Sequence, residues 1–189
     1  VPVEKRPEID RWIISLLNTL VLRVTESLEG YDTTPAARMI QEFVTENLSN
    51  WYVRLNRKRF WGGGMSEDKL AAYQTLYTCL ETVVTLSAPF APFISEQIFA
   101  DLNAVSGNHS DSVHLNPFPK ANTELIDTEL EEMMDIAQRL SSMVLALRRK
   151  GALIVRRPLQ KIAIPAADEV MKSRIEAVKQ LILNEVNVK

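Results

Sequence analysis

Residues 8–29 read Glu-Ile-Asp-Arg-Trp-Ile-Ile-Ser-Leu-Leu-Asn-Thr-Leu-Val-Leu-Arg-Val-Thr-Glu-Ser-Leu-Glu. Apolar side chains recur in this stretch at helical spacing, at Ile9, Trp12, Ile13, Leu16, Leu17, Leu20, Val24 and Leu28. Because this spacing gathers them on one face, it predicts an amphipathic helix. Gly30 follows directly and is expected to end that helix.

Three more helices are expected before residue 103, at about residues 33–60, 66–87 and 93–102. Thr33 or Thr34 is expected to cap the second helix, because Pro35 would then lie in its first turn. The glycine run at residues 62–64 should end that helix in a turn, and Ser66 should cap the helix after it.

The sequence from residue 103 onward predicts a loop, two helices and short strands. Its composition over residues 103–122 is typical of a long loop. A long helix is expected over residues 124–150, because its acidic start and basic end suit the helix dipole. Residues 153–155 and 161–164 are expected to form short strands, and a last helix should begin near Asp168.

The predicted fold class is therefore mainly α, with two parts. Residues 1–121 should form a helical bundle, and residues 122–189 a long helix with a small α+β subdomain that is truncated at the C-terminus. The chain lacks an initial Met and ends within an apolar helical pattern, so we expect it to be a piece of a larger protein.

The composition is that of an ordinary globular domain, with 22 basic and 24 acidic residues. This balance argues against a surface that is basic throughout. The single Cys79 excludes a disulfide framework and is compatible with the cytoplasm. No apolar run reaches the roughly 20 residues that a membrane span requires, so we expect no contact with a membrane.

Motifs for catalysis or metal binding are missing from the sequence. It contains no phosphate-binding Gly-rich loop followed by Lys-Ser/Thr, no His-x-x-x-His and no Cys-x-x-Cys. His109 and His114 lie in the expected loop, where we predict surface or packing roles, and Val113–Leu115 there should be a brief extended piece. We therefore predict no catalytic residue, no metal ligand and no cofactor in this chain.

The most informative chemistry lies at residues 50–61, where four cations are flanked by aromatic residues. The cations are Arg54, Arg57, Lys58 and Arg59, and Trp61 follows them. At about 100° per residue, all of these except Arg59 fall on one arc of a helix. Basic and aromatic side chains together suit the phosphates and bases of a nucleic acid. The alternative is a solvated basic end of a helix, which the helix dipole would favour.

A second cationic stretch runs from Arg148 to Lys161 and includes Arg156 and Arg157. No acidic residue occurs between Asp135 and Asp168. Because Arg suits bidentate contact with phosphate, this stretch also favours nucleic-acid binding.

Several motifs occur in the order found in one protein family. They are Asp10-Arg11-Trp12-Ile13, Asn50-Trp51-Tyr52-Val53-Arg54, Arg57-Lys58-Arg59-Phe60-Trp61, Ala88-Pro89-Phe90-Ala91-Pro92-Phe93, Ser112-Val113-His114-Leu115 and Arg156-Arg157-Pro158-Leu159. Together they resemble the anticodon-binding domain of class I aminoacyl-tRNA synthetases. Within that family, the run that ends in Phe60-Trp61 is most similar to the isoleucyl branch.

The resemblance implies a helical bundle that grips the anticodon stem-loop of isoleucine tRNA. It places Trp51 where methionyl relatives stack a Trp on an anticodon base, and Asn18 where they contact another base. The residues that we accordingly expect to bind tRNA are Arg54, Arg57, Lys58, Arg59, Trp61, Trp51, Asn18, Arg156 and Arg157.

The resemblance also implies a parent enzyme, which uses ATP and Mg to attach isoleucine to its tRNA. The family signatures His-Ile-Gly-His and Lys-Met-Ser-Lys-Ser are absent from the sequence, so we expect this chain to be inactive alone. Its partners would be tRNA and the remainder of the synthetase, within a cytoplasmic monomer. Two alternatives stay open: the equivalent domain of a valyl or leucyl synthetase, and a helical protein-interaction module with a basic strip.

Overall fold

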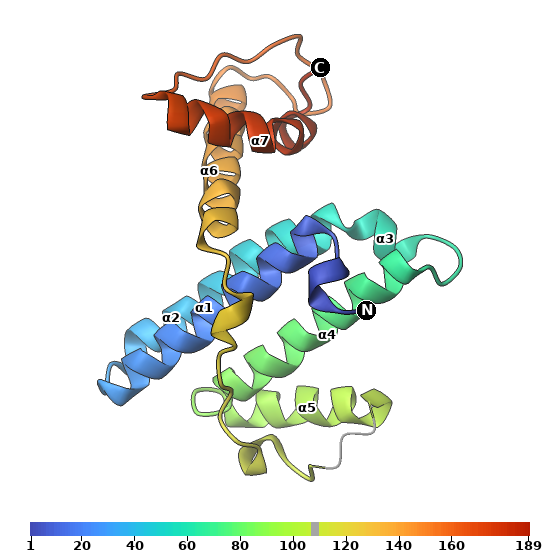
Figure 1. Ribbon diagram of the computed structural model, residues 1–189, viewed down its shortest axis with the longest axis vertical. Helices are drawn as coiled ribbons and strands as arrows, with labels where there is room; N and C mark the ends of the chain where they lie inside the picture. The colour runs from blue at the N-terminus through green and yellow to red at the C-terminus, as the bar shows by residue number, and fades with distance from the viewer. Residues whose placement is uncertain (107–109) are drawn as a thin grey trace. The chain divides into compact units, whose positions relative to one another are not determined.

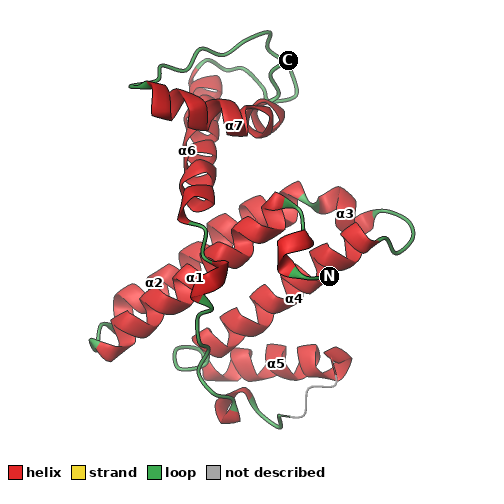
Figure 2. Cartoon of the chain, in the orientation of Figure 1, coloured by secondary structure: helices red, strands yellow, loops and turns green. Residues whose placement is uncertain are grey.

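The structure is a computed structural model that describes residues 1–106 and 110–189 (Figure 1). The chain divides into two compact units, Val1–Ile126 (the first unit) and Asp127–Lys189 (the second unit). Helices dominate both units, and the only strand-like pairing among the described residues is one isolated bridge (Figure 2). The prediction of a mainly α fold is confirmed.

Helices of very different length build the first unit. The long ones are α1 (Glu8–Glu29), α2 (Thr33–Glu42), the π-helix η2 (Phe43–Val53), α4 (Glu67–Ser87) and α5 (Pro92–Ser106). The short ones are η1 (Val3–Lys5), α3 (Arg57–Trp61), η3 (Val113–Leu115) and η4 (Thr123–Leu125). α1 packs against α2, η2 and α4, and α4 in turn packs against α5.

α1 forms as its apolar pattern predicts, and its stripe is the centre of the first unit. Trp12, Ile13 and Val24 are at most 1% exposed. Gly30 ends the helix, and its N–H donates to the carbonyl of Glu26. The chain then reverses at Tyr31, which takes a left-handed conformation with φ of 62°.

The second predicted helix is a longer and less regular path than the sequence suggests. It begins at Thr33 with Asp32 in the N-cap position, so the expectation that Thr33 or Thr34 is the cap was wrong. From Phe43 to Val53 it winds as a π-helix. A turn at Asn56, whose side-chain amide donates to the carbonyl of Tyr52 at 2.8 Å, then separates it from α3.

The start of α4 was predicted correctly, whereas the conformation of residues 113–115 was not. Ser66 caps α4 as expected, and its hydroxyl accepts from the N–H of Lys69 at 3.1 Å. Val113–Leu115 is a 3₁₀ turn and was wrongly expected to be extended. The Glu96 carboxylate holds this turn, because it accepts from the N–H of Val113 at 3.0 Å. His114 is exposed there, whereas His109 lies outside the described residues.

The second unit consists of α6 (Thr128–Lys150) packed on α7 (Glu169–Val186). Asp127 caps α6 and Asp168 caps α7 with their side chains. The two expected strands do not form among the described residues, where only Leu159 and Val188 make a parallel bridge. For residues 153–155 the physical reason is that the carbonyls of Ile154 and Val155 accept hydrogen bonds from the Arg148 side chain rather than from a neighbouring strand.

The buried Cys79 gives a simple test of the first unit's packing. Its side chain is fully buried in α4, and burial together with the nearby Asp10 charge raises the pKa of the thiol well above its usual range. Because the thiolate is the reactive form, we expect Ellman's reagent at mildly alkaline pH to leave the folded chain unlabelled and to react fully in urea. Rapid, complete labelling without denaturant would contradict this packing.

Candidate nucleic-acid interface

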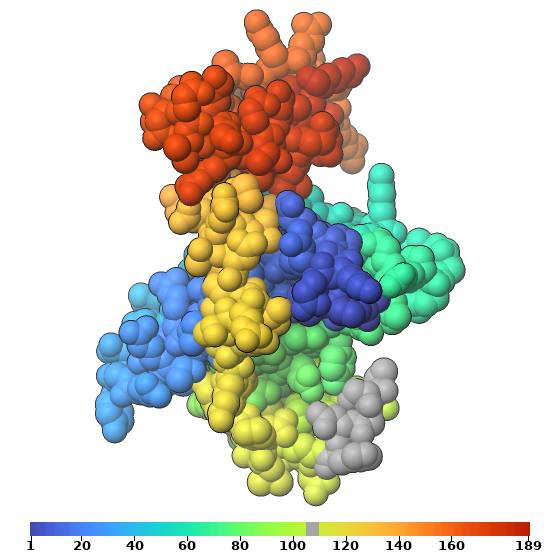
Figure 3. All heavy atoms as spheres, viewed as in Figure 1, coloured from blue at the N-terminus to red at the C-terminus, as the bar shows by residue number. Residues whose placement is uncertain are grey.

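The short helix α3 carries the centre of the basic aromatic segment. It follows the turn at Asn56 and ends before Gly62, and it lies at the surface of the first unit (Figure 3). Arg57 and Lys58 are exposed, and Trp61 is 72% exposed. A large aromatic ring with that exposure leaves most of its surface open to a ligand.

Phe60 anchors α3 to the rest of the unit. Its side chain is buried and lies edge-to-face with the rings of Tyr52 and Tyr73, at centroid distances of 6.3 and 5.4 Å. Edge-to-face contacts of this kind favour one ring orientation. Because Phe60 points inward, Arg57, Lys58 and Trp61 are held toward solvent.

Arg57 and Trp61 lie one turn apart and interact with each other. The Arg57 guanidinium carbon is 5.8 Å from the centroid of the Trp61 ring, within the range of a cation–π contact. One face of the indole thus carries a cation, so a nucleotide stacked near it would meet both a π-surface and a positive charge.

Arg54 lies three residues before α3 and extends the same exposed segment. Its Nε donates to the carbonyl of Asn50 at 2.7 Å, which directs the side chain along the helix. We call Arg54, Arg57, Lys58 and Trp61 the basic face. All four are exposed in the structure.

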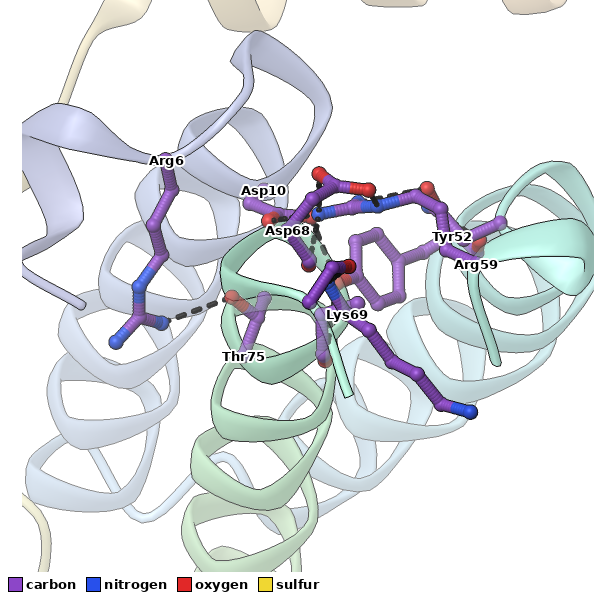
Figure 4. Close-up of polar contacts among 10 residues, drawn as sticks. Arg6, Asp10, Tyr52, Arg59, Asp68, Lys69 and Thr75 are labelled. Atoms are coloured by element: carbon purple, nitrogen blue, oxygen red, sulfur yellow. Dashed lines mark hydrogen bonds and ion pairs between the residues drawn. The ribbon is translucent and has the colours of Figure 1, made fainter. Parts of the chain in front are cut away.

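Arg59, which we also expected to bind tRNA, does not belong to the basic face, because its side chain is turned into the protein. Its side chain is only 16% exposed and donates to both carboxylate oxygens of Asp10, at 2.7 and 2.8 Å (Figure 4). It also pairs with Asp68 at 2.8 Å and donates to the side-chain oxygen of Asn56. A phosphate could reach this guanidinium only by displacing those partners.

Asp10 is the hub of this inner network, although it is completely buried. Besides Arg59, the hydroxyl of Tyr52 donates to it at 2.8 Å. Burial, and after it the Asp10 charge, raises the pKa of Tyr52 above its usual range, while the bond to Asp10 raises the pKa of Arg59. The network therefore ties α1, η2, α3 and α4 together (Figure 4).

Two other residues that the resemblance assigns to anticodon bases are engaged within the protein. Trp51 is 7% exposed and packs in the core, so it has no free face for stacking. Asn18 donates to the carbonyl of Ile14 at 2.8 Å and accepts from the N–H of Asn122 at 2.7 Å. Either side chain would have to leave these contacts to reach a base, and the two assignments stay predictions.

Arg156 and Arg157 lie in the second unit, where both are exposed. From the sequence alone, we grouped them with Arg148 in one cationic stretch. In the structure, the Arg148 side chain is buried. The sequence reasoning also missed Asp10. Its signal was present, because an acid between Ile9 and Trp12 on an apolar stripe must find a buried partner.

Two kinds of feature were not found among the described residues, a cluster of metal ligands and a membrane-spanning helix. They contain no group of three or more His, Cys, Asp or Glu side chains that could hold a metal ion. Within the same residues, no helix combines the length and hydropathy needed to cross a bilayer.

Comparison with known proteins places these features in a family. Residues 10–163 match the family described as "Anticodon-binding domain of tRNA ligase". The whole chain is 60% identical to part of an isoleucine–tRNA ligase of Bacteroides fragilis and covers 17% of that protein. It is 54% identical to the corresponding part of the Porphyromonas gingivalis enzyme and 40% identical to that of Thermus thermophilus, over 16% and 18% of their lengths.

Proposed function

Because the chain belongs to the family of anticodon-binding domains of tRNA ligases, we propose that it binds the anticodon stem-loop of an isoleucine-accepting tRNA. The observation that carries this proposal is the match of residues 10–163 to the family, which includes the whole basic face. The identity of the whole chain to isoleucine–tRNA ligases supports the isoleucine specificity over that of a valyl or leucyl enzyme.

The proposal extends to the protein of which this domain would be a part. The chain spans about 17% of the length of its relatives, so the ligase reaction would need residues outside it. We propose a cytoplasmic, monomeric isoleucine–tRNA ligase that uses ATP and Mg in a separate catalytic domain. The anticodon-binding domain alone would bind tRNA without catalysing aminoacylation.

Each residue of the basic face has a distinct role in this proposal. Arg54, Arg57 and Lys58 would neutralise backbone phosphates of the anticodon stem, a contact that does not depend on sequence. Trp61 would stack on an unpaired base or sugar of the loop, because single-stranded RNA exposes its bases. The inner network of Asp10 and Arg59 would hold α3 in place without touching the RNA.

Trp61→Ala tests the stacking role. We expect it to weaken binding of the anticodon stem-loop by about 1–3 kcal/mol, the usual value of one stacked base, with little change in salt dependence. Fluorescence anisotropy with a labelled stem-loop at several KCl concentrations measures both quantities. Phe93→Ala is the matched control, because Phe93 is a 91% exposed aromatic residue of the same unit on α5. Equal affinities for the wild type and both variants would refute a role for Trp61.

A further inference from the structure

The C-terminal end of α6 contains a buried cation that no acid balances. Arg148 is 2% exposed, and its Nη2 donates to the carbonyls of Ile154 at 2.6 Å, Val155 at 3.3 Å and Arg157. Its Nε and Nη1 are buried without a hydrogen-bond partner. Within the described residues it forms no ion pair with a carboxylate. A buried charge without a counter-charge is costly, so its retention calls for an explanation.

The carbonyls that Arg148 binds belong to the loop that carries two more arginines. We call residues 151–158 the basic loop. The side-chain amide of Asn187 also donates to the carbonyl of Val155, at 2.8 Å, and the N–H of Leu159 donates to the carbonyl of Asn187. The basic loop is thus fixed from the end of α6 and from the end of α7, while its side chains Arg156 and Arg157 stay exposed.

The charged side chains in the sequence around the basic loop are all positive. Between residues 136 and 167 the sequence has seven cations and no acid. Among the residues that the structure describes, Arg139 alone of these seven has an acid partner, Asp135 one turn earlier. The dipole of α6 explains cations in its last turn. It does not explain Arg156 and Arg157, which lie beyond the helix.

We propose that the end of α6 and the basic loop form a second phosphate-binding site, which takes the sugar–phosphate backbone of the bound RNA. Arg149, Lys150, Arg156 and Arg157 contact the phosphates, and Arg148 is a positioning residue that shapes the loop. Arginine favours this ligand because its guanidinium can bind a phosphate through two parallel hydrogen bonds. The inference rests on the proposed tRNA binding, which supplies the polyanion.

The double variant Arg156→Ala/Arg157→Ala tests the site in the 189-residue chain. Both side chains are exposed, so the fold should persist. With an isoleucine tRNA transcript, we expect binding to weaken on the order of a hundredfold at about 50 mM salt. The slope of log K against log salt should become shallower by about 1.4–1.8 units, since each of the two lost phosphate contacts removes about 0.7–0.9. Arg139→Ala is the control, because that cation is already balanced by Asp135 and should leave the slope unchanged.

The outcomes separate this inference from the proposed function. No binding of the tRNA by the wild-type chain would refute the proposed function itself. Binding that depends on Arg57 and Trp61 but is the same in the Arg156→Ala/Arg157→Ala variant would overturn only the second site. In that case the basic loop would be free to meet an acidic protein surface.

Arg148 is tested by Arg148→Met and by the conservative Arg148→Lys. A lysine keeps the charge and has three donors for the same carbonyls, so it should restore the wild-type salt slope. Arg148→Met should shallow the slope as the double variant does, since the basic loop loses its shape. A purely structural role would lower the melting temperature of Arg148→Met and leave its slope intact, which would overturn the positioning role. If Arg148→Met does not fold, the double variant still decides whether the site exists.

Discussion

Replacing Asp10 by Ala is expected to destabilise the first unit by about 3–5 kcal/mol, because it leaves the Arg59 guanidinium without its buried counter-charge. Asp10 is fully buried and accepts from Arg59 through both oxygens and from the Tyr52 hydroxyl. Removing it deprives two nitrogens of Arg59 of a charged acceptor and leaves the Tyr52 hydroxyl with only the Ala72 carbonyl, at 3.3 Å. Urea unfolding monitored by tryptophan fluorescence measures the decrease in the free energy of unfolding.

Two features of the chain make this measurement selective. Its three tryptophans, Trp12, Trp51 and Trp61, all lie in the first unit, so their fluorescence follows that unit's unfolding. Asp68→Ala is the matched control, because Asp68 pairs with the same arginine but is 52% exposed. An exposed pair contributes at most about 1 kcal/mol. Equal losses for Asp10→Ala and Asp68→Ala would mean that the buried network does not stabilise the unit.

Replacing Arg57 and Lys58 together by Ala is expected to weaken tRNA binding on the order of a hundredfold at about 50 mM salt. Each phosphate contact with a duplex stem changes log K by about 0.9 per tenfold change in salt, so two contacts over the range from about 1 M to about 50 mM give that factor. Fluorescence anisotropy with the labelled anticodon stem-loop measures the affinity.

The free energy of unfolding of this double variant shows whether a loss of affinity comes from a loss of stability. Both side chains are exposed, so the free energy of unfolding should change by no more than about 0.5 kcal/mol for each. A large loss of affinity with unchanged stability assigns the effect to contact with RNA. Unchanged affinity would leave the basic face as a solvated helix end, which the helix dipole favours.

The sequence predicted those parts of the fold that local signals determine. The apolar period of residues 8–29 predicted α1, and Ser66 predicted the start of α4, because periodicity and capping depend on neighbours along the chain. The prediction of short strands was wrong because a strand forms only when a neighbouring strand accepts and donates its backbone hydrogen bonds. Alternation at residues 161–164 cannot tell whether a second strand lies beside it.

The composition of the candidate site and the common face of Arg54, Arg57, Lys58 and Trp61 were predictable, but the internal partner of Arg59 was not. Four cations occur between residues 54 and 59, yet Arg59 points inward to Asp10 while the other three are exposed. A uniform helical period placed the four exposed residues on one arc, although it did not predict the π-helix up to Val53 or the turn at Asn56. The role of Trp51 was ambiguous from the sequence, because an aromatic residue on an apolar stripe can either pack in the hydrophobic core or stack on a nucleotide base.

Comparing two RNA hairpins tests the proposed function most directly. One is the isoleucine anticodon stem-loop, and the other has the same length and base composition with a scrambled loop. Sequence-specific recognition of RNA reads the edges of unpaired loop bases, and one such contact discriminates by about 1–3 kcal/mol, so we expect the chain to prefer the anticodon stem-loop on the order of tenfold. This preference should persist as salt rises, whereas both affinities fall. Equal affinity for the two hairpins at every salt concentration would contradict recognition of the anticodon.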